Sequence, residues 1–162
     1  MAKSFKSSKE KRDGDRFVVL PHIVVDSPSY RDLSHTARSL LVDIARQYTG
    51  SNNGRLVACT KYLRPMGWKS NDTITRALKE LKEAMLLIET RMGYRPNRAA
   101  WYALGWYVLD YSRDMDIDPK TYRTGGYKIA PLIPSGGAGR KRIGPSGGVG
   151  PSVVAPSAGT MQ

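Results

Sequence analysis

The chain has 162 residues and a formal net charge of +12, from 26 lysines and arginines against 14 aspartates and glutamates, which indicates one domain with tails and a polyanionic partner. Cys59 is the only cysteine, which excludes an intrachain disulfide and a cysteine-based metal framework. No apolar run approaches the roughly 20 residues of a membrane span, and the N-terminus lacks the apolar stretch of a secretory signal, so we expect a cytoplasmic protein without membrane association.

The N-terminal quarter of the chain divides into an arm and an apolar segment. Residues 1–15 are polar and basic and are expected to form a flexible arm. Residues 16–25 are apolar and β-branched, but Pro21 interrupts them, which favours an edge strand or two short pieces over one central strand. The sequence Asp26-Ser27-Pro28 is typical of a turn.

The next segment is predicted to form a helix. Ser34 is a suitable N-cap for a helix of about fourteen residues that ends near Tyr48. Its expected buried face recurs at helical spacing and consists of Ala37, Leu40, Leu41, Ile44, Ala45 and Tyr48.

A loop, a short strand and a second helix are expected to follow. Residues 50–54 have Asn-Gly turn chemistry, and residues 55–58 are predicted to form a short strand that pairs with a later hairpin. Thr60 is expected to cap a short helix over residues 61–64, which Pro65 ends. Trp68 is predicted to fill the core.

The stretch from Ser70 to Gly93 has the strongest pattern. An apolar stripe recurs at spacings of three and four and consists of Ile74, Ala77, Leu78, Leu81 and Met85. Ser70 or Asn71 can cap this helix, and Asp72 complements its dipole. From residue 86 the period changes to two, which predicts a strand, followed by a turn over residues 93–97 and a return strand over residues 98–104.

The order of capped helix, strand, basic turn and strand is that of a winged helix. The pattern Ser70-x-x-Thr73-Ile74-x-Arg76-Ala77-Leu78-x-x-Leu81 resembles the recognition-helix signature of the GntR family and related bacterial winged-helix regulators. It also resembles the winged-helix modules of plasmid and phage replication proteins. The resemblance covers roughly residues 33–110 and implies an α+β fold, a small winged helix of three helices and a β-hairpin wing. Met85 departs from the pattern, which usually has Gly at that position.

The first two turns of the predicted recognition helix are expected to contact bases, because an α-helix fits the major groove with its N-terminal residues at the base edges. The candidates are Asn71, Thr75, Arg76 and Lys79. The alternative is that Arg76 and Lys79 only form i,i+4 pairs with Glu80 and Glu83 on a solvated surface.

Phosphate contacts are expected around the turn and on the wing. Residues 55–98 are the most basic block, with ten basic and four acidic residues. The candidates at the turn are Lys61, Arg64, Lys69 and Ser70, and those on the wing are Arg91, Arg95 and Arg98. The alternative for the wing arginines is that they only solubilise a hairpin. Aromatic residues that can stack on single strands, but are better suited to core packing, are Tyr94, Trp101, Tyr102, Trp106 and Tyr107.

The end of the chain changes in composition. Residues 106–109 are predicted to close the core, so that the domain comprises residues 16–111. Residues 112–162 are expected to be a mostly disordered tail rich in Gly, Pro and Ser. Its basic cluster, Arg140-Lys141-Arg142, is interpreted as a solvated charge run or a phosphate contact.

Catalysis has little support, because His22 and His35 lie in different segments and neither a nucleophile–base pair nor metal-ligand spacing is visible. We therefore expect a non-enzymatic protein without metal or cofactor. The predicted function is duplex-DNA binding, as a compact transcriptional regulator or a replication-initiation accessory of a phage or mobile element. The alternatives are an RNA- or ribosome-associated basic protein and a protein-binding adaptor with the winged helix as scaffold. Homodimerisation and a protein partner for the tail are left open.

Overall fold

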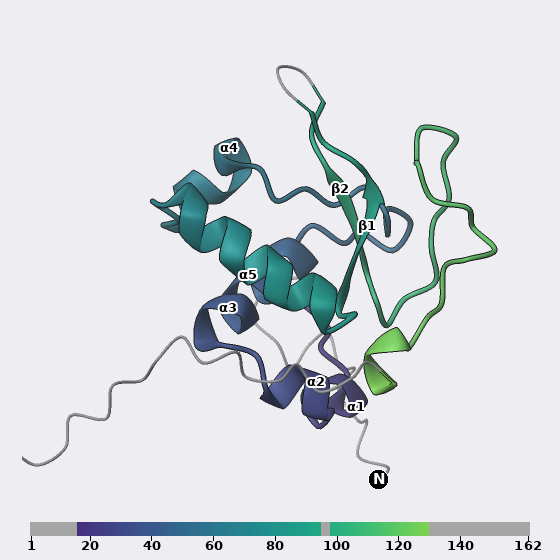
Figure 1. The fold of residues 1–162 in the computed structure, drawn as a ribbon, viewed down its shortest axis with the longest axis horizontal. Helices are drawn as coiled ribbons and strands as arrows, with labels where there is room; N and C mark the ends of the chain where they lie inside the picture. Colours follow the sequence, from purple (N-terminus) through teal and green to yellow (C-terminus); the bar gives the residue numbers. More distant parts are fainter. Residues whose placement is uncertain (1–15, 95–97, 130–162) are drawn as a thin grey trace, which may run out of the picture.

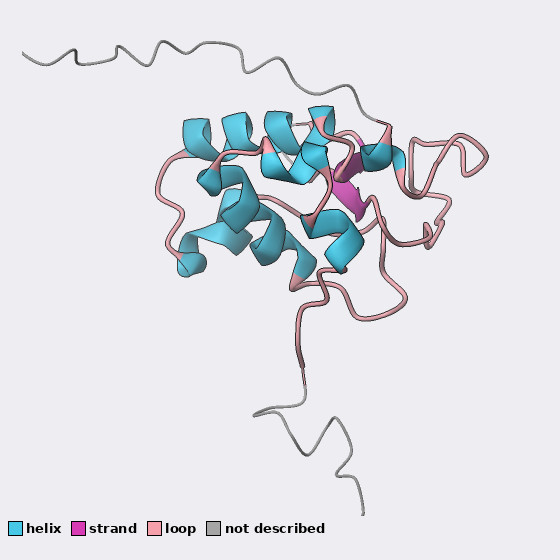
Figure 2. Cartoon of the chain, turned by 90° about the horizontal axis from the view of Figure 1, so that it is seen from below, coloured by secondary structure: helices cyan, strands magenta, loops and turns pink. Residues whose placement is uncertain are grey.

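The computed structural model describes residues 16–94 and 98–129, which form an α+β arrangement around one two-stranded antiparallel sheet (Figure 1). The elements are, in chain order, α1 His22–Val25, α2 Pro28–Arg31, α3 His35–Ala45, α4 Thr60–Leu63, the 3₁₀ helix η1 Arg64–Met66, α5 Asn71–Glu83, β1 Leu87–Arg91, β2 Trp101–Leu104 and the 3₁₀ helix η2 Gly126–Lys128. The longer helices lie on one side of the sheet and a loop-rich C-terminal segment lies on the other (Figures 1 and 2). None of the helices in the described ranges has the length and apolar character that a membrane span needs.

The prediction of strand over residues 16–25 is wrong. Residues 16–21 have no regular structure, and residues 22–25 form the helical turn α1. The Ser27 hydroxyl donates to the Val24 carbonyl at 2.6 Å and accepts from the Tyr30 N–H at 3.3 Å, so the expected turn both ends α1 and caps α2. A helical turn buries Val24 completely, whereas a strand here would need a free sheet edge to pair with. Tertiary context therefore overrides the β-propensity of this segment.

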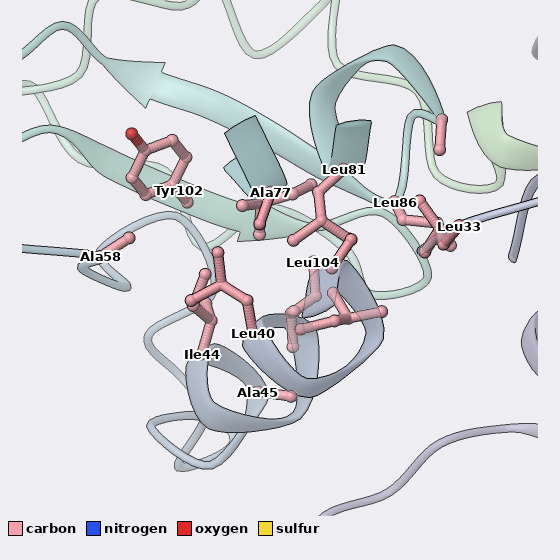
Figure 3. Close-up of a cluster of buried hydrophobic side chains, with 14 of the residues drawn as sticks. Leu33, Leu40, Ile44, Ala45, Ala58, Ala77, Leu81, Leu86, Tyr102 and Leu104 are labelled. Atoms are coloured by element: carbon pink, nitrogen blue, oxygen red, sulfur yellow. The ribbon is translucent and has the colours of Figure 1, made fainter. Parts of the chain in front are cut away.

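Helices α3 and α5 pack against each other and build the core. The Ser34 hydroxyl caps α3 by accepting from the Ala37 N–H at 3.1 Å, as predicted. The expected buried face of α3 is confirmed from Ala37 to Ala45, but the helix ends there and Tyr48 lies beyond it, stacked on Tyr107 with ring centroids 4.3 Å apart. Figure 3 shows the α3 side chains of this core facing those of α5 and β2.

Helix α5 ends in a left-handed residue that is not glycine. Met85 has φ = +54°, the only positive φ among the described non-glycine residues. The Leu86 N–H donates to the Leu81 carbonyl at 3.1 Å, and the Met85 N–H donates to the Lys82 carbonyl at 3.0 Å. These two bonds form a Schellman motif. Met85 therefore occupies the position and the conformation of the glycine that the resemblance led us to expect.

The predicted hairpin forms, with an irregularity in its ladder. Strand β1 pairs with β2 from Leu87 opposite Leu104 to Arg91 opposite Trp101, and the register shifts between Glu89 and Arg91. The short strand predicted over residues 55–58 is reduced to one antiparallel bridge between Leu56 and Tyr102. That bridge covers the free edge of β2, which limits edge-to-edge pairing.

Residues 112–129, which the sequence assigned to a disordered tail, instead pack on the domain. The Met115 side chain is buried against Gly54, where φ is +117° and any Cβ would lie 2.6 Å from the Met115 methyl group. The Tyr127 ring is buried as well, and its carbonyl accepts from the Ser29 hydroxyl at 2.7 Å. The folded unit thus extends at least to residue 129. The predicted N-terminal arm, residues 1–15, and the remainder of the tail, residues 130–162, lie outside the described residues.

Candidate nucleic-acid interface

The start of α5 is joined directly to α4. The Thr60 hydroxyl donates to the Asn71 side-chain oxygen at 2.7 Å, and the Ser70 hydroxyl accepts from the Thr73 N–H at 3.3 Å, which confirms Ser70 as the N-cap. Between the two helices the chain turns at Gly67, whose φ of +94° favours glycine. Thr60 is the first residue of α4 rather than its cap, because Cys59 occupies the N-cap position.

Trp68 connects this turn to α3 by a hydrogen bond. Its indole N–H donates to the Asp43 carboxylate at 2.7 Å, and its ring packs partly against the core. The prediction that Trp68 has a structural role is confirmed. The contacts of Trp68 with Asp43 and the core therefore hold the backbone of the α4–α5 turn in place.

Three exposed cations surround the start of α5. Within residues 16–94 and 98–129, Lys61, Arg64 and Lys69 have no carboxylate within ion-pair distance. Lys61 and Arg64 line a shallow hollow together with Thr60 and Pro65. Because the hydrogen bond between Thr60 and Asn71 brings α4 beside the start of α5, Lys69 belongs to the same end of the molecule. The three residues are called the turn cluster below, and no ion pair within the described residues competes with a polyanion for them.

The exposed cations of α5, in contrast, are paired. Arg76 forms an i,i+4 pair with Asp72 at 2.8 Å, and Lys79 pairs more loosely with Glu83 at 3.8 Å. The expected pair of Arg76 with Glu80 is wrong, since the Glu80 carboxylate instead accepts from the Ser34 N–H at the start of α3.

The two uncharged base-contact candidates take part in local bonds. The Thr75 hydroxyl donates to the Asn71 carbonyl at 2.8 Å. The Asn71 side-chain oxygen accepts from Thr60, which leaves the Asn71 amide N–H groups as donors toward solvent. Both residues are exposed on the first turns of α5, where the prediction placed them.

The arginines of the hairpin are held by aromatic rings and by a carboxylate. The Arg91 guanidinium carbon lies 3.2 Å from the centroid of the Trp101 ring, and its nitrogens donate to the Ala99 carbonyl at 3.3 and 3.0 Å. Arg98 lies over the Tyr94 ring and pairs with Asp116 at 2.7 Å. Arg95 lies outside the described residues.

Asp116 was missed by the sequence reasoning. Its carboxylate accepts from the Met92 N–H at 2.8 Å and from Arg98, and its own N–H donates to the Thr90 carbonyl at 2.8 Å. The hydrogen bond from Met92, followed by the contacts with Arg98, lowers the pKa of the Asp116 carboxyl. Hydrogen bonding to Tyr94 and Asp116 raises the pKa of Arg98. The acidic stretch 113–118 was visible in the sequence, but its contact with the hairpin was not.

The aromatic residues separate into two groups. Tyr102 is buried, and burial raises its pKa to about 12. Trp106 and Tyr107 pack against the core, as predicted, but Val108, which was expected to close the core with them, is 77% exposed. The expectation of core packing is wrong for Tyr94 and Trp101, which lie outside that core cluster on the outer half of the hairpin, with Tyr94 61% exposed.

The turn cluster and the outer half of the hairpin lie toward the same end of the molecule. Figure 1 shows α4 and the start of α5 at the end toward which the hairpin extends, while α1, α2 and η2 lie at the opposite end. His22 and His35 are both exposed, and in the part of the chain that the structure describes no three His, Cys, Asp or Glu side chains are placed to hold a metal ion. A scan against protein-family models and searches of curated proteins and of solved structures found no match.

Proposed function

We propose that this protein binds duplex DNA as a small winged helix, in the role of a compact transcriptional regulator or a replication-initiation accessory of a phage or mobile element. The observation that carries the proposal is the turn cluster. Lys61, Arg64 and Lys69 are exposed, unpaired among the described residues and grouped around the start of an amphipathic helix. Unpaired cations at a helix start are suited to neutralise phosphates while the helix enters the major groove.

The order and packing of the elements support the same proposal. Helix α3 packs on α5, the short α4 meets the start of α5, and the β1–β2 hairpin follows α5 directly. A winged helix needs these three helices and this hairpin in this order. Helix α4 has four residues, and η1 extends it to the turn at Gly67.

The turn cluster and Arg76 are proposed to contact different parts of the DNA, the phosphates and the bases respectively. The turn cluster supplies affinity and register, since phosphate contacts carry no sequence information. Arg76 supplies discrimination, because a bidentate arginine–guanine contact is worth roughly 1–3 kcal/mol. Its exposed pair with Asp72 is worth only about 0.3–0.5 kcal/mol, so exchanging that carboxylate for a base edge is favourable.

The salt dependence of binding tests the role of the turn cluster. Fluorescence anisotropy of the full chain on random duplex DNA is measured over a salt series, for the wild type, for the triple variant Lys61→Gln, Arg64→Gln, Lys69→Gln, and for a matched control. The control, Lys120→Gln, Arg123→Gln, Lys128→Gln, removes the same charge from exposed positions of the 112–129 segment. With about six phosphates neutralised, the wild-type slope of log K against log salt is expected near −5.

The turn variant is expected to flatten that slope by about 2.7, whereas the control stays near the wild-type value. Equal slopes for the two variants would show that only net charge matters and would contradict the proposal. Tighter binding of structured RNA than of duplex DNA in the same series would favour the RNA-associated alternative. Absence of nucleic-acid binding at moderate salt would favour the protein adaptor.

The base-reading role of Arg76 is tested separately by selecting binding sites from a random duplex library. Arg76→Ala is expected to relax the selected sequence preference by about 1–3 kcal/mol at one position. Lys61→Gln is the control, since it is expected to weaken binding to all sequences alike. An unchanged preference in the Arg76 variant would remove this residue from the base-reading set.

A further inference from the structure

We propose that the outer half of the β1–β2 hairpin binds unpaired DNA nucleotides next to the bound duplex, by stacking their bases on two separate groups, the Arg91 guanidinium that lies on Trp101 and the exposed ring of Tyr94. This inference rests on the proposed duplex binding and adds to it a second class of ligand, a single-stranded extension or an opened segment.

The register shift of the hairpin creates the first stacking group. Because the ladder shifts between Glu89 and Arg91, Arg91 stands directly opposite Trp101. Its guanidinium carbon is 3.2 Å from the ring centroid, so cation and indole are in stacking contact. Two guanidinium nitrogens of Arg91 donate to the Ala99 carbonyl, and these hydrogen bonds hold the guanidinium in its orientation on the ring.

Arg91 also forms no ion pair with a described residue, although its charge is close enough to Asp116 to lower the pKa of that carboxyl. Within residues 16–94 and 98–129, no carboxylate lies within ion-pair distance of this guanidinium. A fixed cation that lies on an aromatic plane combines the two contacts that single-stranded nucleic acids use, which are a positive charge for the backbone and a π surface for the bases.

Tyr94 is the second stacking group and lies nearer the tip of the hairpin. It is 61% exposed and is bridged to Arg98 by backbone hydrogen bonds of 2.9 and 3.0 Å. Arg98 lies over the Tyr94 ring and is itself held by Asp116 of the 112–129 segment. The ring is therefore supported from the hairpin and remains accessible.

Trp101 and Tyr94 are not needed to fill the hydrophobic core. Tyr102, on the same strand as Trp101, is buried, whereas Trp101 and Tyr94 lie outside the core cluster of the described residues. In a base-paired duplex the faces of the bases are covered by their neighbours, so stacking on protein side chains requires unpaired bases. A winged helix with this hairpin is therefore suited to duplex DNA that adjoins an opened or single-stranded segment.

The test separates base stacking from phosphate attraction. The full chain is titrated with a blunt duplex, with the same duplex carrying an oligothymidine extension, and with the same duplex carrying an equally long abasic extension. The two extended probes have the same phosphate charges, and only one has bases. The thymine extension is expected to bind at least about fivefold more tightly than the abasic one, the low end for one stacked base. Equal affinity for the two extensions would overturn the proposal.

Matched variants assign the effect to the hairpin. Tyr94→Ala is expected to remove most of the preference for thymine over abasic extensions while the affinity for blunt duplex stays within about twofold. Tyr111→Ala, which removes another exposed tyrosine, is expected to keep the preference. If Tyr94→Ala weakened all three probes equally, the ring would have a structural role only and the proposal would be wrong.

The two proposals fail in distinguishable ways. If the chain did not bind blunt duplex but still preferred thymine to abasic extensions, duplex binding would be wrong and stacking would stand. If it bound blunt duplex and did not distinguish the extensions, duplex binding would stand and stacking would be wrong.

Discussion

Met85 adopts a backbone conformation that side chains other than glycine usually avoid. Its φ of +54° is required by the Schellman motif that ends α5 and starts β1. For an L-residue this conformation is unfavourable by roughly 1–2 kcal/mol. The side chain reaches Gly126, where an added Cβ would lie 3.2 Å from the Met85 methyl group. Contact with η2 therefore offsets part of the backbone strain at this residue.

Two substitutions at Met85 separate strain from contact. Both Met85→Gly and Met85→Ala lose the side chain, but only Met85→Gly relieves the strain. We expect the Gly variant to be more stable than the Ala variant by about 1 kcal/mol, opposite in sign to the same comparison inside a helix. Urea denaturation followed by far-UV circular dichroism measures the difference. An Ala variant as stable as the Gly variant would mean that the chain leaves α5 in a different conformation.

At the level of elements, the 112–129 segment forms hydrogen bonds with the outer edge of β1 and with the residues that follow β2. Asp116 bonds the outer edge of β1 at Thr90 and Met92. The Tyr122 hydroxyl oxygen lies 2.9 Å from the Leu104 carbonyl oxygen and 2.8 Å from that of Tyr107, so its one proton is shared between these two acceptors at the end of β2. Burial raises the pKa of Tyr122 to about 12. The segment is therefore attached at both ends of the hairpin by polar contacts as well as by Met115.

Tyr122→Phe tests the attachment after β2. Loss of the hydroxyl is expected to lower the free energy of unfolding by about 1–3 kcal/mol at neutral pH, since it removes the one donor that the two carbonyls share. The protonated phenol is favoured in the folded state, so its contribution is complete below pH 10 and is lost as pH rises toward about 12. The difference between wild type and variant should therefore shrink over that range. A difference that stayed constant from neutral pH to pH 12 would contradict this role.

At the level of the whole molecule, Asn53 connects three parts of the chain that are distant in sequence. It is fully buried, and its side-chain nitrogen lies 3.2 Å from the carbonyls of Leu104 and Tyr107 and 2.9 Å from that of Val108. Its side-chain oxygen accepts from the Leu104 N–H at 2.7 Å. The Tyr122 hydroxyl lies 3.4 Å from the same amide nitrogen. The loop after α3, the segment after β2 and the 112–129 segment thus share one buried amide.

Asn53→Ala should therefore destabilise the whole domain. We expect a loss of roughly 3 kcal/mol or more, because several buried donors and acceptors are left without partners at once. Asn52→Ala is the control, since its half-buried side chain bonds Gln47 and Thr49 and should contribute about 1 kcal/mol. Urea unfolding followed by both circular dichroism and tryptophan fluorescence should give one midpoint per variant. Separate midpoints for the two probes would show that Asn53 stabilises only a local region.

The sequence by itself determined the elements that depend on local interactions. The caps Ser34 and Ser70, the apolar face of α3, the stripe of α5 from Ile74 to Leu81 and the change of period into the hairpin are all encoded within a few residues. The inclusion of Met85 in that stripe was wrong, because Met85 lies after the helix and is exposed. The positions of the turn cluster and of the base-contact candidates at the start of α5 followed from those elements.

Only the tertiary structure decided the features that depend on contacts between distant residues. Residues 22–25, part of the predicted strand, form the helical turn α1, which buries Val24, while Leu56 and Asp116 bond the outer edges of the sheet. Arg98 pairs with Asp116, and Asn53 is buried, through contacts that span tens of residues. Periodicity and capping report on neighbours in the chain, whereas these contacts form only when separate segments pack together.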